Sequence, residues 1–250
     1  MNATPRHTVR RARPLLGTLV EVGVCAPDDD ASLHIACDAA FAAVVDVQRQ
    51  LSRFDAASDI ARFNALPAGG WLDVRSDTAL VLAAAQQLFD DSDGVFDVSL
   101  GSAPAAWQLH SRRLHKLSDA VQLDLGGIGK GHAVDRAVQA LQLAGVADGW
   151  VNAGGDLRSF GSATVALRLR DEQRGGVIDF GRLHGGAFAT SHFGAGARSR
   201  LSAVAAPARS HVSVAAPNCL LADALTKVVA ATGDVEHPLM ARKGVRAWLH

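Results

Sequence analysis

The sequence has no excess charge of either sign and few cysteines, and each shortage excludes a class of protein. Its 25 basic residues balance its 25 acidic residues, which leaves no general attraction for nucleic acid or for an anionic membrane surface. The three cysteines, Cys25, Cys37 and Cys219, lie far apart without a CxxC pair, a pattern that predicts buried thiols and neither disulfides nor a zinc site. Any polyanion that this protein binds should therefore be small.

Long hydrophobic runs and familiar catalytic signatures are also missing. No stretch reaches the roughly 18 uninterrupted apolar residues of a membrane span. Arginines precede the apolar residues 14–20 as in a signal peptide, but Glu21 interrupts that run, and bulky Val24 precedes Cys25 where lipoprotein cleavage requires a small residue. The histidines have no metal-ligand spacing, and no Gly-x-Ser-x-Gly motif occurs. We expect a cytoplasmic chain without membrane insertion.

The residues that are present predict a globular α+β protein. Hydrophobic residues make up 48% of the 250 residues, which is enough for a sizeable core in a single domain over residues 1–250, with 1–12 as a flexible N-terminal segment. Periodicity and capping residues predict helices over 31–51, 58–64, 78–89, 131–143 and 219–232, and strands over 18–24, 114–117, 121–125 and 244–249, with short glycine-separated strands over 147–216. Helices separated by runs of short strands favour antiparallel sheets with packed helices.

The densest chemical signal is the segment 123–135, in which a predicted strand runs through four glycines into a helix. Glycines let backbone N–H groups approach a phosphate, and a helix N-terminus adds positive potential. The segment is not a Walker loop, because Asp124 stands where the first glycine should be and Gly131 where Ser or Thr should be. Nor is it a G-x-G-x-x-G fingerprint. Phosphate binding and a glycine turn used only for close packing both remain open at this point.

Three further segments place polar residues in tight turns: 51–64, 96–101 and 151–156. Taken singly, each is better explained by a simple turn than by a binding site. In the last predicted helix, Asp223 and Lys227 are four residues apart and therefore on one face. They could form a surface ion pair of small energy. However, the helix is apolar over most of its surface, and an Asp in such a place usually serves a cap, a partner or a metal.

In their order along the chain, these segments resemble the FAD:protein FMN transferase family, the ApbE-like flavin transferases. The matching segments are 13–18, 52–64, 96–101, 124–135, 152–156, 189–191 and 222–225, and they span nearly the whole chain. The resemblance implies an ApbE-like (T-fold-like) architecture. It also implies an enzyme that cleaves the pyrophosphate of FAD, moves FMN onto a Ser or Thr hydroxyl of an acceptor flavoprotein and releases AMP. Such phosphoryl transfer usually uses Mg²⁺.

The resemblance also implies roles for particular residues. It places FAD-binding functions at Leu16, Phe54, Ser99, Leu100, Gly101, Asp124, Gly127 and Lys130. It places catalytic functions at Asp223 and Lys227, and metal ligation at the Gly127 carbonyl, Asp223 and Thr226.

The sequence departs from the family at some of these positions. The family has a metal-binding Thr where this chain has Lys227, and a protonated ammonium donates hydrogen bonds and cannot ligate Mg²⁺. We therefore expect Lys227 to pair with Asp223 and to replace part of the metal site. The family's His-Ile-x-Asp-Pro segment has only residues 203–207 as a counterpart, without the His and the Asp, and His132 replaces a Tyr. FAD binding without catalysis and FAD hydrolysis are the alternative functions.

Overall fold

The computed structural model describes residues 7–26, 30–170, 175–193 and 211–250 of the chain. The helices are α1 (Asp30–Leu51), α2 (Asp59–Asn64), α3 (Ser76–Asp91), α4 (Gly129–Leu143), α5 (Cys219–Thr232) and α6 (Pro238–Lys243). The strands are β1 (His7–Leu15), β2 (Thr18–Ala26), β3 (Trp71–Asp73), β4 (Trp107–His110), β5 (Arg113–Lys116), β6 (Asp148–Ala153), β7 (Asp156–Arg170), β8 (Val177–His192), β9 (His211–Ala216) and β10 (Arg246–Leu249).

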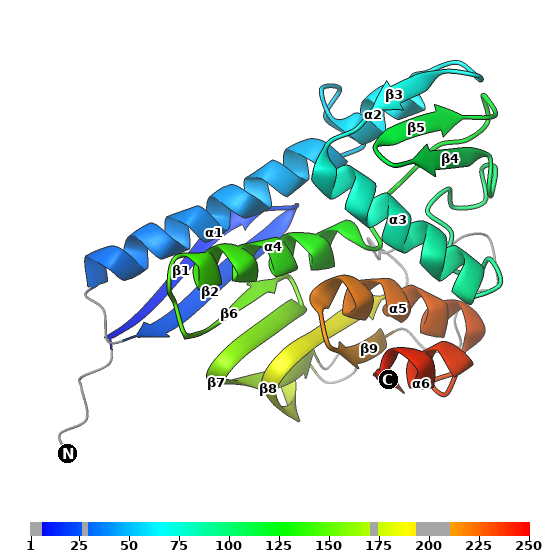
Figure 1. Ribbon diagram of the computed structural model, residues 1–250. Helices are drawn as coiled ribbons and strands as arrows, with labels where there is room; N and C mark the ends of the chain where they lie inside the picture. Colours follow the sequence, from blue (N-terminus) through cyan, green and yellow to red (C-terminus); the bar gives the residue numbers. More distant parts are fainter. Residues whose placement is uncertain (1–6, 27–29, 171–174, 194–210) are drawn as a thin grey trace.

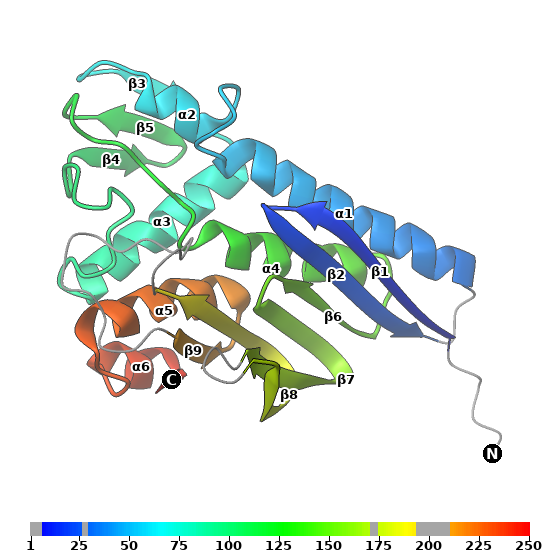
Figure 2. The same cartoon turned by 180° about the vertical axis from the view of Figure 1, so that it is seen from behind.

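The strands form two sheets in which every neighbouring pair is antiparallel. A seven-stranded sheet has the order β1-β2-β6-β7-β8-β9-β10, and a three-stranded sheet has the order β3-β5-β4. Figure 1 shows α1, α4 and α5 side by side over one face of the large sheet, and Figure 2 shows the strands of that sheet from behind. The small sheet lies with α2 and α3 at one end, and we call this group the small lobe. The prediction of an α+β fold is confirmed.

The core lies between the large sheet and its helices and continues into the small lobe. It joins Phe41 of α1, Val151 of β6 and Leu225 of α5 to Leu72 and Leu114 of the small sheet. Helix α1 is long and apolar enough to cross a membrane by length and composition alone. One of its faces is packed in this core, and a core helix of a globular protein passes the same test.

Two tight hairpin turns meet at one end of the large sheet. Leu16 and Gly17 join β1 to β2 with φ of 56° and 69°, and Gly154 and Gly155 join β6 to β7 with φ of 61° and 102°. Such left-handed backbone in two-residue hairpins favours glycine. At Gly154 a side chain is excluded as well, because a Cβ atom there would lie 2.3 Å from the Thr18 hydroxyl. This packing brings the predicted flavin-contacting turn at Leu16 beside the turn that leads into Asp156.

Parts of the predicted secondary structure were wrong. Residues 7–12 of the segment predicted to be flexible belong to β1, which pairs with β2 along its whole length. Residues 121–125 form no strand, because the side-chain amide of Asn64 takes the place of a strand partner: it donates to the Leu123 carbonyl at 2.9 Å and accepts from the Leu123 N–H at 2.8 Å. The short strands expected over 147–216 include two long ones, β7 and β8, and α6 was not predicted.

Candidate functional site

The glycine segment forms a tight loop that ends at the N-terminus of α4. Asp124 closes the loop, since its Oδ1 accepts a hydrogen bond from the Gly126 N–H at 2.8 Å. Its Oδ2 lies 3.1 Å from Nε of Arg53, which comes from the chain after α1. The helix begins at Gly129, two residues before the predicted start. The loop therefore presents its backbone at a helix N-terminus, as phosphate binding requires.

The N-termini of α4 and α5 are held together by carboxylates that each helix supplies to the other. Asp223 of α5 accepts a hydrogen bond from the Gly131 N–H of α4 at 3.1 Å. Asp135 of α4 accepts from the N–H groups of Cys219 and Leu220 of α5, both at 2.9 Å. Each carboxylate satisfies N–H groups of a first helical turn that have no partner within their own helix. Gly131 is required at this crossing, because a Cβ atom there would lie 2.2 Å from the Cys219 carbonyl oxygen.

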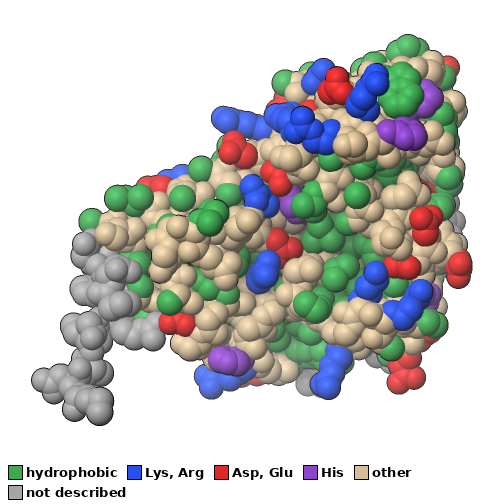
Figure 3. All heavy atoms as spheres, in the orientation of Figure 1, with side chains coloured by type: hydrophobic (Ala, Val, Ile, Leu, Met, Phe, Trp, Pro, Cys, Tyr) green, Lys and Arg blue, Asp and Glu red, His purple; other side chains and the backbone are tan. Residues whose placement is uncertain are grey.

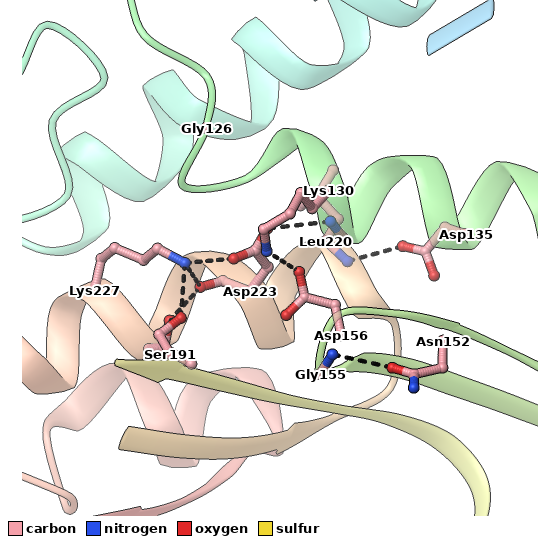
Figure 4. A network of polar contacts seen from close by, with 12 residues as sticks. Gly126, Lys130, Asp135, Asn152, Gly155, Asp156, Ser191, Leu220, Asp223 and Lys227 are labelled. Atoms are coloured by element: carbon pink, nitrogen blue, oxygen red, sulfur yellow. Dashed lines mark hydrogen bonds and ion pairs between the residues drawn. The ribbon is translucent and has the colours of Figure 1, made fainter. Parts of the chain in front are cut away.

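Two lysines and two aspartates meet below this loop in an arrangement that we call the lysine–aspartate cluster: Lys130, Asp156, Asp223 and Lys227 (Figure 4). Nζ of Lys130 contacts Asp156 Oδ2 and lies 3.6 Å from Asp223 Oδ2. Nζ of Lys227 contacts Asp223 Oδ1 and donates to the Asp223 carbonyl at 2.9 Å. The predicted pairing of Lys227 with Asp223 is confirmed, and both side chains are buried.

Burial and neighbouring charges shift the pKa values within the cluster. Burial and the charge of Asp223 raise the pKa of Asp156 to about 6, although Lys130 and Lys227 act in the opposite direction. Burial would also raise the pKa of Asp223, but the charges of Lys130 and Lys227 overcome it and lower that pKa below its usual value. Burial disfavours the charged form of Lys130, yet Asp156 and Asp223 raise its pKa. At neutral pH the cluster therefore contains an ionised Asp223 and a charged Lys130.

A second turn to which the resemblance assigns FAD contacts lies beside the loop. Ser99 and Gly101 belong to a turn closed by Asp97, whose carboxylate accepts from both of their N–H groups at 2.8 Å. Leu100 has a φ of 51° in this turn. The turn lies directly beside the loop, because the Asp124 N–H donates to the Val98 carbonyl at 2.8 Å.

Phe54 lies on the surface, and its side chain is freely accessible. It is 84% exposed, and the guanidinium of Arg53 lies 4.4 Å from the centre of its ring. The two residues border an open hollow of about 490 Å³, which is also lined by Arg62 and Leu66 of the small lobe. In Figure 3 several Lys and Arg side chains lie over the small lobe and the adjoining end of α1, and others lie lower on the same face. The hollow connects to the loop through the contact between Arg53 and Asp124.

The predicted metal ligands do not fit a divalent cation. The Thr226 hydroxyl donates to the Asp223 carbonyl at 2.7 Å and lies 2.8 Å from Ser191 Oγ, so it is already engaged. The carboxylate of Asp223 is paired with ammonium groups, and a Cβ atom at Gly127 would lie 3.3 Å from Cε of Lys227. Within the described parts of the chain, no group of three or more His, Cys, Asp or Glu side chains is placed to hold a metal ion.

Sequence reasoning missed three residues of the site. In the sequence, Asp156, Ser191 and Asp135 lie within segments that match the family, but none of the three is assigned a role. Ser191 accepts a hydrogen bond from Lys227 Nζ at 3.1 Å across the junction of β8 and α5. The one sequence feature that indicated such partners was Lys227, a lysine within the apolar helix predicted over 219–232. The counterpart of the family's His-Ile-x-Asp-Pro segment, 203–207, lies outside the described residues.

Comparisons with known proteins identify the family of this chain. The family model described as "ApbE family" matches residues 16–119 and 108–249. A curated protein of Rhodobacter capsulatus, named FAD:protein FMN transferase, is 29% identical over 74% of this chain, which spans only 44% of that protein's length.

Solved structures of ApbE proteins share the fold of this chain. The apo flavinyl transferase ApbE of Pseudomonas stutzeri has a TM-score of 0.80 and 25% identity, covering 99% of this chain and 92% of its own. The ApbE protein of Thermotoga maritima has a TM-score of 0.84 and 22% identity, covering 97% and 94%. The flavin transferase ApbE of Vibrio cholerae has a TM-score of 0.78 and 20% identity, covering 98% and 94%.

Proposed function

The chain belongs to the ApbE family, and on that premise we propose that it is an FAD:protein FMN transferase. Its substrates would be FAD and an acceptor protein with a Ser or Thr hydroxyl, and its products the flavinylated acceptor and AMP. The observation that carries the proposal is the glycine loop at the N-terminus of α4 with the charged Lys130 at its start.

The loop and Lys130 suit the diphosphate of FAD. Gly126 is exposed, so that the backbone can be approached, and the side chain of Lys130 is 32% exposed while its ammonium contacts two carboxylates. A phosphate group that reaches Lys130 would meet a positive charge that is already oriented, in partly desolvated surroundings where such attraction is strong. Phe54 follows Arg53, which contacts Asp124, and the turn at Ser99–Gly101 lies beside the loop. These residues and Leu16 would contact the flavin and the nucleoside parts.

The reaction balances without further reactants. The oxygen of the acceptor hydroxyl forms a bond to the phosphorus of the FMN half of FAD. The bond from this phosphorus to the bridging oxygen breaks, so AMP leaves with that oxygen, and the proton of the hydroxyl is released. The protein mainly positions the groups and neutralises negative charge. In the proposed function, Lys130 stabilises the charge that develops on the departing phosphate, and Asp156 and Asp223 hold its ammonium in place.

The experiment measures AMP after the protein is incubated with FAD, with and without a candidate acceptor protein. AMP that forms only with the acceptor, together with a mass increase of the acceptor, supports the transferase. AMP that forms without the acceptor indicates FAD hydrolysis, and FAD that is bound but intact indicates a binding protein. Either result would contradict the proposal.

A matched pair of variants tests the assigned role of Lys130. Lys130→Gln should reduce AMP formation at least about a hundredfold, since it removes an oriented charge from the transition state. Lys243→Gln is the control, because Lys243 is exposed to a similar degree and is also paired with a carboxylate, that of Asp91. It should leave the rate unchanged.

A further inference from the structure

We propose that the ammonium of Lys227 is the resident cation of this site and that the protein binds the diphosphate of FAD without a divalent metal. This inference rests on the proposed function, and it assigns to one residue a task that the family leaves to Mg²⁺.

The Lys227 ammonium has a complete set of oxygen partners. It contacts Asp223 Oδ1, and it donates to the Asp223 carbonyl at 2.9 Å and to Ser191 Oγ at 3.1 Å. An ammonium has three N–H donors, so each has an acceptor. Carboxylate, carbonyl and hydroxyl oxygens are also the ligands that hard cations take. The ammonium therefore occupies an oxygen cage that would otherwise suit a metal ion.

The hydrogen bonds around this cage form a closed ring. Thr226 donates its hydroxyl proton to the Asp223 carbonyl at 2.7 Å, so the Thr226 oxygen must accept from Ser191, which lies 2.8 Å away. Ser191 in turn accepts from Lys227. Every hydroxyl in the ring has a fixed direction, and replacing the ammonium by a metal ion would require the ring to reorganise.

The space and the charge of the site both oppose an additional cation. The stem of Lys227 passes against the loop, as the distance of 3.3 Å between its Cε and a Cβ atom built at Gly127 shows. Figure 4 shows the side chain extended towards Asp223 and Ser191, and it is only 8% exposed. Two ammonium groups already balance the two carboxylates of the cluster. A divalent ion would leave two buried positive charges uncompensated, which costs several kcal/mol per ion in protein interiors.

The first measurement needs no variant. The protein without FAD is titrated with Mn²⁺, which replaces Mg²⁺ and is detected by electron paramagnetic resonance. We expect no saturable binding. The affinity for FAD, measured by flavin fluorescence in EDTA and in Mg²⁺, should agree within about twofold. Saturable binding of one Mn²⁺, or an FAD affinity that falls about tenfold or more in EDTA, would overturn the inference.

Variants of Lys227 give the second measurement. Lys227→Thr should gain one Mn²⁺ site, and its FAD affinity should be at least about tenfold higher in Mg²⁺ than in EDTA. Lys227→Met keeps the stem without the charge and should bind FAD more weakly than wild type in both buffers. Lys243→Met is the surface control and should behave like wild type. A Lys227→Met protein with unchanged FAD affinity would show that the ammonium does not serve the diphosphate.

The outcomes separate this inference from the proposed function. Wild-type protein that binds FAD only with Mg²⁺ contradicts the inference and leaves the transferase proposal intact. Wild-type protein that binds no FAD in either buffer contradicts the proposed function. In that case the Mn²⁺ titration alone still decides whether the ammonium has replaced a metal ion.

Discussion

Two buried aspartates, Asp59 in the small lobe and Asp223 in α5, have many polar contacts, but the contacts differ in kind. Asp59 accepts from the N–H of Arg75 at 2.8 Å, from Nε of Arg75 at 3.1 Å and from the Thr78 hydroxyl at 2.7 Å. Arg75 and Thr78 both belong to the start of α3, so Asp59 joins two short neighbouring segments. Asp223 is contacted from another helix and from within its own, below a loop made of glycines.

The cations beside these carboxylates show the decisive difference. The side chain of Arg75 is 46% exposed, whereas that of Lys227, one of the two lysines beside Asp223, is 8% exposed. A solvated cation beside a buried carboxylate is sufficient for a structural role. Burying the cation as well costs desolvation energy, which stability alone rarely justifies. A buried carboxylate therefore indicates a functional site only when its partner cation is buried as well.

Removal of each carboxylate should give the largest contrast. Asp223→Ala leaves Lys227 without its ionic partner and should lower the free energy of unfolding by about 3–5 kcal/mol and abolish FAD binding. Asp59→Ala should cost about 1–3 kcal/mol and leave FAD affinity unchanged. Urea denaturation and FAD titration measure both. If Asp223→Ala proves too unstable to measure, Asp223→Asn can be used in its place, and it should still lose affinity for FAD. The comparison would fail if the variants of Asp223 kept their affinity for FAD, or if Asp59→Ala lost it.

The pH dependence of stability should reveal the burial of Asp156 in the same cluster. Folding raises its pKa from 3.8 to about 6, so the folded state favours the protonated carboxyl. This contribution is complete below pH 3.8 and is lost as the pH rises through about 6. Between pH 4 and pH 7, wild type should therefore lose up to about 3 kcal/mol of unfolding free energy relative to Asp156→Asn. Asp59→Asn, measured in parallel, is the control for removing a buried carboxylate. A difference that does not vary with pH would contradict the assigned pKa.

The smallest contrast concerns two buried threonines beside the two aspartates. Thr78→Val and Thr226→Val each remove one hydroxyl and should each cost about 1 kcal/mol of unfolding free energy. Since Thr226 is not expected to ligate a metal, Thr226→Val should bind FAD equally well in EDTA and in Mg²⁺. A loss of affinity that appears only in Mg²⁺ would restore Thr226 as a metal ligand. Thermal unfolding and FAD titration are sufficient for both variants.

The sequence predicted the site best where local rules act. The spacing of Asp223 and Lys227 predicted a pair on one helical face, and the structure confirms it. The glycines after Asp124 predicted a turn into a helix, and α4 begins there. Both predictions depend on residues that are close in the chain, where helical geometry and glycine conformation decide the outcome.

Prediction failed where a partner came from far along the chain. Residues 121–125 have a strand pattern, but the side chain of Asn64 binds the N–H and the carbonyl of Leu123 at their centre. Asp156 and Lys130 are 26 residues apart, and Ser191 and Lys227 are 36 apart. No periodicity connects such positions, because their distance depends on how β6, β7 and β8 lie against α4 and α5.

By itself, the sequence determined the family, the α+β class and the residue types available for binding a diphosphate. The family followed from the resemblance of seven segments, whereas composition and short-range spacing are enough for the class and the residue types, since they set propensity, turn geometry and total charge. The tertiary structure alone decided that Lys227 is buried instead of solvated and that Ser191 is a further oxygen partner of its ammonium. The physical reason is that desolvation and pairing depend on which elements pack together. The helical periodicity of a sequence does not specify which element packs against each face of the helix.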